Sequence, residues 1–371
     1  MLLLSADPAR AALDARALAW MREPPGAWCG DEARFASLAL DLFAFQFARC
    51  APYRRFCERH GRTPDCVTDW REIPAVPAGA FKEMALRSFP AECELHTFRT
   101  SGTSTERRGA LHLDTLELYE ASLLPSFRRG VLPDLPAGKR ARIRVLAPSP
   151  AETPDSSLSH MFGVVLREFG DAASGFDVEN GVLRIDELVD ALETAAADRV
   201  AVALCGTAFA VVHLLDALAA RGARIPLATG SRVMETGGFK GRAREMPREA
   251  LYAGIKHALG VAPARIVNQY GMTELGSQFY DSVLCEPARP RRKIAPPWTR
   301  VRLVDPETGD DAAPGAPGVV TILDLANTGS VLAIETADLG RAIGDSFEVI
   351  GREPGAEARG CSIAADEMLA T

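Results

Sequence analysis

The chain has 371 residues, of which 47% are hydrophobic and 25% are charged, and its formal net charge is -7. This balance is typical of a globular protein, and the length allows either one large domain or two of medium size. The negative net charge argues against a nucleic-acid partner, because proteins that bind nucleic acid present a basic surface to the phosphates.

The cysteines and the apolar runs indicate where the protein resides. None of the eight cysteines belongs to a Cys-x-x-Cys pair, so a zinc or thioredoxin-type site is not expected, and scattered cysteines in so long a chain are typical of reduced thiols. No apolar run reaches the roughly 18 residues that span a membrane. The apolar start at residues 1–5 is too short for a signal sequence. We therefore expect a cytoplasmic protein without a membrane span.

Helix and strand patterns alternate over the first 286 residues. Apolar periodicity predicts helices over residues 6–22, 31–49, 114–130 (with Asp114 as its N-cap), 157–169 and 183–196, and one that follows the loop 205–209 and ends near Ala220. Short apolar runs predict buried strands over residues 142–148, where the run ends in a loop, and over residues 199–204, 224–229 and 265–267. Strands that alternate with helices favour a largely parallel sheet with helices on both faces, which binds ligands beyond the carboxyl ends of its strands.

The pattern changes near residue 287. Strands are predicted over residues 299–304 and 319–325, with a turn sequence between them, and an apolar strand follows at 331–334. The basic cluster at 289–293 is expected to be a solvated loop. The sequence therefore predicts an α/β core over residues 1–286, a β-rich subdomain over 287–350 and a short C-terminal tail over 351–371.

Residues 268–274, Asn-Gln-Tyr-Gly-Met-Thr-Glu, follow the strand predicted at 265–267 and carry several groups suited to a nucleotide. A base can stack on Tyr270, and Gly271 lets the backbone pass close to a ligand. Thr273 can donate to a phosphate oxygen, and Glu274 can hold Mg²⁺ beside the phosphates. An ordinary solvated turn is the alternative interpretation of this segment alone.

A second polar loop lies far upstream, at residues 100–105. Its hydroxyls and small residues allow close approach of backbone N–H groups to phosphate, and Arg107 and Arg108 add positive charge. The spacing is not that of a Walker A loop, and a plain serine-threonine-glycine turn is the alternative. The candidate phosphate-binding residues are Thr100, Ser101, Gly102, Thr103 and Ser104.

These two segments, with two more in the same chain order, resemble motifs of the adenylate-forming (ANL) superfamily. Residues 236–240, Thr-Gly-Gly-Phe-Lys, are similar to the segment that lies along the adenine, which implies that Gly237 and Gly238 bind there. Residues 335–341 are similar to the ribose-binding motif, which implies that Asp338 accepts both ribose hydroxyls. Gly351-Arg352 resembles the start of the superfamily hinge. The resemblance implies the large α/β domain of these enzymes, with ATP and Mg²⁺ as cofactors.

The end of the chain is similar to the acyl-protein synthetases of bacterial luminescence, the LuxE type. Residues 355–362, Gly-Ala-Glu-Ala-Arg-Gly-Cys-Ser, carry the resemblance, and Cys361 matches the cysteine that accepts the acyl group in that type. Arg359 can lower the pKa of this thiol, and Glu357 and Asp366 oppose it. An inert tail thiol is the alternative. Only 19 residues follow Arg352 and none is lysine, so the C-terminal lid of larger superfamily members is expected to be truncated.

The expected function is ATP-dependent activation of a fatty or related carboxylic acid as an acyl-adenylate, followed by transfer to Cys361 and on to a partner protein similar to an acyl reductase. An acyl pocket lined by Met161, Phe162, Phe209 and Met234 is expected. Two alternatives remain open: an acyl- or aryl-CoA ligase of the phenylacetate type, and a non-catalytic subunit that binds a nucleotide or an acyl group. Glu274, Thr273 and Cys361 are the predicted catalytic residues.

Overall fold

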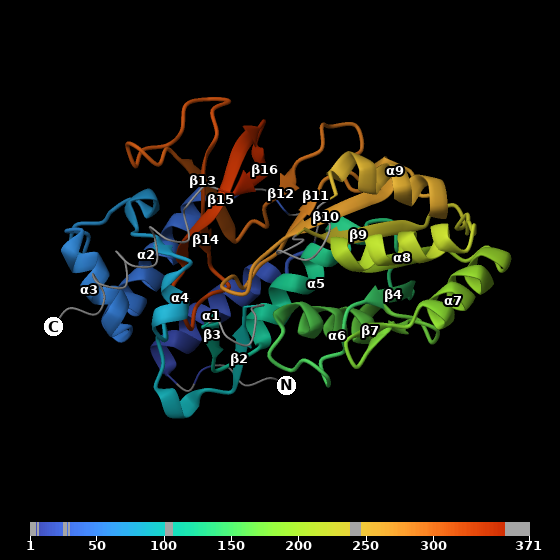
Figure 1. Cartoon of the computed structure of the whole chain (residues 1–371). Helices are drawn as coiled ribbons and strands as arrows, with labels where there is room; N and C mark the ends of the chain where they lie inside the picture. The colour runs from blue at the N-terminus through green and yellow to red at the C-terminus, as the bar shows by residue number, and fades with distance from the viewer. Residues whose placement is uncertain are drawn as a thin grey trace. The chain divides into compact units, whose positions relative to one another are not determined.

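The computed structural model describes residue 5 and residues 7–24, 28, 30–100, 107–237 and 246–352 (Figure 1). The chain divides into two compact units. Unit 1 comprises Met1–Pro125, Met272–Gln278 and Arg292–Thr371, and unit 2 comprises Ser126–Gly271 and Phe279–Arg291. Contacts within the chain thus group the first 125 residues with the late strands, whereas the sequence grouped them with the α/β core. Helix α5 (Glu117–Val131) carries Pro125, where the two units divide.

Unit 2 contains the α/β layer. Its strands lie in the order β11-β10-β9-β8-β4-β5. They are β4 (Arg142–Leu146), β5 (Gly175–Phe176), β8 (Val202–Thr207), β9 (Arg232–Thr236), β10 (Ile266–Tyr270) and β11 (Phe279–Asp281). All neighbouring pairs from β5 to β10 are parallel, and β11 is antiparallel to β10. The largely parallel sheet predicted from the sequence is confirmed.

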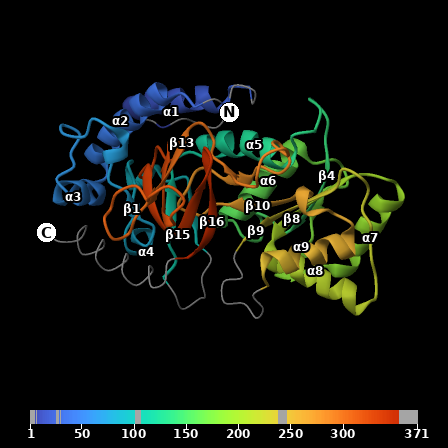
Figure 2. The same cartoon turned by 90° about the horizontal axis from the view of Figure 1, so that it is seen from above.

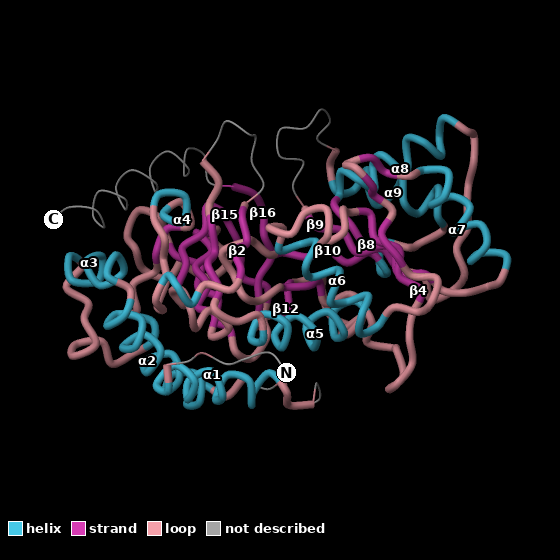
Figure 3. The backbone as a smooth tube through the Cα atoms, turned by 90° about the horizontal axis from the view of Figure 1, so that it is seen from below, coloured by secondary structure: helices cyan, strands magenta, loops and turns pink. Residues whose placement is uncertain are grey.

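Helices cover both faces of this sheet, as predicted. They are α6 (Ser157–Phe169), α7 (Ile185–Ala197), α8 (Ala208–Ala220) and α9 (Arg248–Leu259), with a 3-10 turn η4 (Pro263–Arg265) and a small hairpin β6 (Val178–Glu179) and β7 (Val182–Leu183). Figures 2 and 3 show α8 and α9 on one side of β8–β10 and α6 on the other. Apolar side chains of β8, α8 and α9, such as Leu204, Val211 and Ile255, are fully buried together, which drives the packing.

Two strand predictions in unit 2 were wrong: one strand begins later than predicted, and the other predicted segment is not a strand. Arg199 has a φ of +56° and Val200 N donates to Ala195 O at 2.8 Å, so residues 199–200 turn and β8 begins only at Val202. The predicted strand at 224–229 is not a strand. Ile225 N and Leu227 N donate instead to Ala258 and Leu259 at the end of α9, and β9 follows at Arg232. Pro226, between them, has no N–H to give a sheet.

Unit 1 contains a β-rich sheet together with the N-terminal helices. Its sheet has the antiparallel order β13-β14-β15-β16-β12, and β1 pairs with β15 in parallel. The strands are β1 (Val76–Pro77), β12 (Lys293–Ile294), β13 (Thr299–Val304), β14 (Gly318–Asp324), β15 (Ala333–Ile343) and β16 (Ser346–Arg352), with a separate hairpin β2 (His96–Arg99) and β3 (Ala110–Leu113). The helices are α1 (Pro8–Met21), α2 (Glu32–Arg49), α3 (Ala51–Arg59) and α4 (Ala80–Glu83), with 3-10 turns η2 (Trp70–Glu72) and η3 (Ala91–Cys93).

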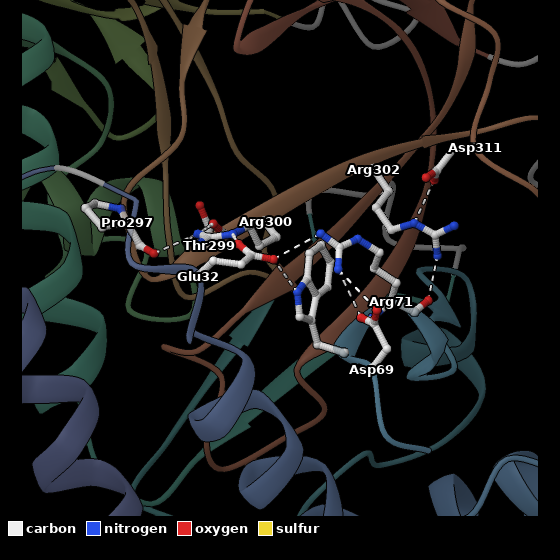
Figure 4. A network of polar contacts seen from close by, with 9 residues as sticks. Glu32, Asp69, Arg71, Pro297, Thr299, Arg300, Arg302 and Asp311 are labelled. Carbon is white, nitrogen blue, oxygen red and sulfur yellow. Dashed lines mark hydrogen bonds and ion pairs between the residues drawn. The ribbon is translucent and has the colours of Figure 1, made fainter. Parts of the chain in front are cut away.

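Ion pairs join the N-terminal helices of unit 1 to its sheet. Glu32, at the start of α2, lies between Arg300 of β13 and Arg71 of η2, with N···O distances of 3.0 Å to each (Figure 4). Arg302 of β13 donates to Asp311 at 2.8 Å and to the carbonyl of Arg71 at 2.7 Å. The network fixes α2 and η2 against β13 within unit 1.

Two further predictions in unit 1 are corrected. Asp114 does not cap α5, because it pairs with the buried Arg10 at 3.1 Å. Thr115 Oγ1 accepts from Glu117 N instead, at 3.2 Å. The basic cluster is not a solvated loop throughout: Arg292 and Lys293 are 6% and 4% exposed.

Candidate functional site

In unit 1 the serine-threonine loop leaves from the end of a β-hairpin. Thr100 N donates to Gly109 O, and Gly109 N donates to Thr100 Oγ1, both at 2.9 Å. These bonds extend the pairing of β2 with β3 by one residue and fix both ends of the loop. The loop thus follows one strand of an antiparallel pair and precedes the other, so it does not leave from the carboxyl end of a parallel strand. Ser101, Gly102, Thr103 and Ser104 lie outside the described residues.

The two arginines that follow the loop have protein partners. Arg107 donates to the carboxylate of Glu83 at 3.0 Å and to its carbonyl at 3.1 Å. Arg108 Nε donates to Thr100 O at 2.5 Å. Arg108 therefore braces the hairpin end at the residue where the loop begins.

Glu274 lies beside the same hairpin end. This glutamate is only 6% exposed. A Cβ added to Gly109 would lie 3.5 Å from Glu274 Oε1 and 3.1 Å from Thr100 Cγ2. Gly109 thus leaves room for the carboxylate to approach Thr100. Two predicted site residues more than 170 positions apart in the chain are brought together within unit 1, with Thr273 adjacent to Glu274 in the sequence.

A buried polar network holds the segment Met272–Gln278. Ser277 Oγ donates to Asp324 Oδ1 at 2.7 Å, and Trp298 Nε1 donates to Ser277 Oγ at 3.1 Å. Asn327 Nδ2 donates to the carbonyl of Glu274 at 2.8 Å. Asp324, Asn327 and Ser277 are at most 3% exposed, and buried polar groups are stable only when they are hydrogen-bonded in this way.

Sequence reasoning missed Asp324 and Asn327. The available signal was Asp324, a polar residue between the apolar Leu323 and Leu325 near the end of the strand predicted at 319–325, with Asn327 two residues after that strand. Polar residues that interrupt an apolar run at a strand end are typical of a satisfied buried network.

Burial raises the pKa of Asp324 from 3.8 to about 6, although the hydrogen bond from Ser277 lowers it. Because the folded state then holds the proton more tightly, this group's contribution to the free energy of unfolding is largest below about pH 4 and is lost as the pH rises through about 6. At about 1.4 kcal/mol per pKa unit, the change is about 3 kcal/mol.

Asp324→Asn keeps an oxygen acceptor for Ser277 but does not titrate. We expect the free energy of unfolding of the wild type, minus that of the variant, to fall by about 3 kcal/mol between about pH 4 and pH 7. Urea unfolding at a series of pH values measures this difference. A difference that stays constant over the range would contradict the assigned shift.

Asp338 and Arg352 lie on neighbouring strands of unit 1. They are register partners across β15 and β16, and Arg352 Nε lies 3.4 Å from Asp338 Oδ1. The sequence placed Asp338 just after a strand, but β15 continues through it to Ile343. Asp338 N donates to Thr336 Oγ1 at 3.1 Å, which fixes the backbone at this point. The side chain of Asp338 is 19% exposed and that of Arg352 is 61% exposed.

In unit 2 the predicted residues lie at the carboxyl ends of parallel strands, as expected. Tyr270 ends β10, and its ring centroid lies 6.2 Å from that of Phe279. Gly237 follows β9, and a Cβ added there would lie 3.7 Å from Asn268 Nδ2. Gly271 follows Tyr270 in the chain, and Gly238 lies outside the described residues.

A buried glutamate supports this edge of unit 2. Glu235 of β9 accepts from Asn268 Nδ2 at 2.9 Å and from the Tyr252 hydroxyl at 3.2 Å, and it is 3% exposed. Asn268 N donates to Asp281 Oδ2 at 3.1 Å. The backbone N–H and the side-chain amide of Asn268 are therefore both hydrogen-bonded, at the start of the motif that contains Tyr270.

The residues expected to line an acyl pocket have mixed positions. Met161, Phe162 and Met234 are at most 1% exposed and belong to the core. Phe209 is half-buried and stacks on His213, with ring centroids 6.4 Å apart and an interplanar angle of 7°. Phe209 is thus the one of the four that keeps partial access to solvent.

The donor set at the hairpin end suits a hard cation. Within the described residues there is no group of three or more histidine, cysteine, aspartate or glutamate side chains that could hold a metal ion. Mg²⁺, however, is commonly held by one or two carboxylates together with substrate phosphates. Glu274 beside Thr100 fits that pattern, with oxygen donors only.

Across the part of the chain that the structure describes, no helix has the length and apolar character needed to cross a membrane. Cys361, the predicted acyl acceptor, lies outside the described residues.

Comparison with known proteins identifies the family. The family described as "Acyl-protein synthetase, LuxE" matches residues 5–370. The chain belongs to this family. A curated relative, the long-chain-fatty-acid–luciferin-component ligase of Aliivibrio fischeri, is 23% identical over 85% of the chain and 82% of its own length. Membership of the acyl-protein synthetase family makes the chain an enzyme of the ligase class.

Solved structures agree on the fold of this acyl-protein synthetase family member. A 2-hydroxyisobutyryl-CoA ligase in the postadenylation state, in complex with R3-HIB-AMP, superposes with a TM-score of 0.65 at 13% identity, over 90% of this chain and 73% of its own. The same ligase in an open conformation gives a TM-score of 0.62 at 14% identity, over 86% and 70%. The adenylate-forming fold class predicted from the sequence is confirmed.

Proposed function

We propose that this acyl-protein synthetase family member activates a fatty or related carboxylic acid with ATP, holds the acyl group on Cys361 and passes it to a partner protein. The observation that carries the first step is the approach of Glu274 to Thr100 at the end of the β2–β3 hairpin. It brings a carboxylate to the loop that resembles the phosphate loop of adenylate-forming enzymes.

In the first step a carboxylate oxygen of the acid attacks the α-phosphorus of ATP. A new P–O bond forms, the bond to the bridging oxygen of pyrophosphate breaks, and pyrophosphate leaves with the electron pair. The hydroxyls of Thr100 and Thr273 and the loop after Thr100 would donate hydrogen bonds to phosphate oxygens. Mg²⁺, held by Glu274, would neutralise charge on the phosphates.

The remaining site residues are assigned to the nucleotide from the motifs to which they belong. Asp338 would accept hydrogen bonds from the ribose hydroxyls, and Arg352 would orient its carboxylate, since Arg352 Nε lies 3.4 Å from Asp338 Oδ1. Tyr270 would stack on the base, with Gly237 and Gly271 leaving the backbone open beside it. Gly238 and Ser101–Ser104 are assigned to the same nucleotide from the sequence.

In the second step the Cys361 thiolate attacks the acyl carbon. A C–S bond forms, the acyl–phosphate C–O bond breaks, and AMP leaves, so the acyl group is stored as a thioester. The acceptor is then a protein rather than coenzyme A. The relative from Aliivibrio fischeri is named for a long-chain fatty acid and a luciferin component, which supports a long-chain acid as substrate and a reductase-like protein as acceptor.

The test is intact-protein mass spectrometry after incubation with ATP, Mg²⁺ and a panel of carboxylic acids. The expected result is a hydroxylamine-sensitive mass increase of one acyl group that requires ATP, with the largest yield for long-chain acids. Exchange of labelled pyrophosphate into ATP, stimulated by the same acids, measures the first step alone. Absence of both signals would favour a binding subunit, and product formation only with free coenzyme A would favour an acyl-CoA ligase.

A further inference from the structure

The segment Asp324–Ser330 of unit 1 has no role in the proposed chemistry, yet it is buried and polar. Asp324, Asn327, Thr328 and Ser330 are all at most 3% exposed. The segment connects β14 to β15 and packs against the turn that carries Glu274. A Cβ added to Gly276, two residues after Glu274, would lie 2.7 Å from Ala326 Cβ and 3.0 Å from Asn327 Oδ1. The two segments are therefore in direct contact, with no space for a larger residue.

Asn327 makes the polar contact between them. Its Nδ2 donates to the main-chain carbonyl of Glu274 at 2.8 Å. Since the carbonyl and the carboxylate belong to one residue, this bond fixes the point from which the Glu274 side chain extends towards Thr100.

Asn327 is itself held by α2. Gln46, which is fully buried, donates from Nε2 to the carbonyl of Asn327 at 2.8 Å and accepts from Leu332 N at 2.9 Å. Asn327 N also donates to the carbonyl of Asp324 at 3.1 Å. Hydrogen bonds thus hold both the backbone N–H and the backbone carbonyl of Asn327, so its side-chain amide has a defined direction.

We propose that Asn327 is a positioning residue that sets the place of Glu274 and thereby the affinity of the ATP complex for its divalent cation. The inference rests on the proposed function, in which Glu274 holds Mg²⁺. A metal-binding carboxylate works only when it is held within about 0.5 Å of its productive position. Groups that orient a ligand without touching the metal typically change metal affinity or activity by about 10- to 100-fold when they are lost.

The test compares Asn327→Ala and Asn327→Asp with Ser330→Ala as a matched control. Ser330 lies in the same buried segment and donates to the carbonyl of Leu86 at 2.8 Å, so its loss removes one buried hydrogen bond without touching the Glu274 turn. Mn²⁺ titration by electron paramagnetic resonance, with a non-hydrolysable ATP analogue present, reads the metal affinity without turnover. Circular dichroism checks that each variant is folded. If Asn327→Asp does not fold, Asn327→Ala alone tests the positioning role.

The expected result is Mn²⁺ binding weakened by about 10-fold or more in both Asn327 variants, and by less than about twofold in Ser330→Ala. Adding Asn327→Ala to Glu274→Gln should weaken Mn²⁺ binding little further, because the asparagine acts through the glutamate. Equal effects of Asn327→Ala and Ser330→Ala would overturn the positioning role while leaving the proposed function in place. Absence of ATP-dependent Mn²⁺ binding in the wild type would overturn both.

Discussion

Glu274→Gln is expected to lower acid-stimulated ATP–pyrophosphate exchange by about 100- to 1,000-fold, the range seen when one preorganised group that stabilises transition-state charge is removed. Glutamine keeps the size of the side chain but not its charge. Glu274 is 6% exposed and lies beside Thr100 at the hairpin end, and the lost negative charge is the one that would hold Mg²⁺ beside the phosphates. Initial-rate exchange at saturating acid measures the effect.

A matched control for this variant is Glu348→Gln. Glu348 is also in unit 1 and pairs with Arg341 at 3.7 Å on the surface of β15 and β16, where its side chain is 31% exposed. Loss of such a surface pair costs at most about 1 kcal/mol of stability, and exchange should remain within about twofold of wild type. Exchange by Glu274→Gln above about a third of the wild-type rate would contradict the assigned role.

The parts of the fold that the sequence predicted are those where local pattern and tertiary packing agree. Helix α6 was predicted at its observed bounds, because residues 157–169 have an apolar face and Ser156 caps the first turn, accepting from Ser159 N at 3.2 Å. Strand β13 was likewise predicted at Thr299–Val304. In both, turn residues mark the ends, so neighbouring elements have little influence on where they start.

The errors arose where tertiary contacts decide. Residues 224–229 have the composition of a buried strand, but their N–H groups pair with the end of α9 and not with a sheet. Strand β15 extends through Asp338 because β14 and β16 pair with it on both sides. Local composition does not show which partner a backbone N–H will find, so these outcomes needed the whole fold.

The residues of the candidate site also differ in whether local sequence pattern or tertiary contact reveals them. Thr100, Glu274 and Asp338 could be proposed from the sequence because each belongs to a short motif with characteristic residue types. Asn327 was not found, because its importance depends on one hydrogen bond to a main-chain carbonyl 53 residues earlier in the chain. A main-chain acceptor has no signature in the sequence, so a side chain that binds it is visible only in the structure.

Cys361→Ser is expected to abolish the hydroxylamine-sensitive acyl adduct while leaving acid-stimulated ATP–pyrophosphate exchange within about threefold of wild type. Adenylation involves the acid and ATP only, and the thiol enters afterwards. A serine hydroxyl is almost fully protonated at neutral pH and is a far weaker nucleophile than a cysteine thiol. The two readouts on one variant therefore separate the two steps.

Cys66→Ser is the matched control, because Cys66 is an exposed thiol with a lowered pKa and is therefore open to unspecific acylation. It is exposed, and the hydrogen bonds that Thr63 donates, first from its backbone N–H, lower the pKa of its thiol. The buried thiols of Cys50, Cys57 and Cys205 have raised pKa values, so they are poor competitors. The adduct should persist in Cys66→Ser and disappear in Cys361→Ser. The reverse result would assign the label to chemical acylation of an exposed thiol, and acyl transfer through the tail cysteine would then be excluded.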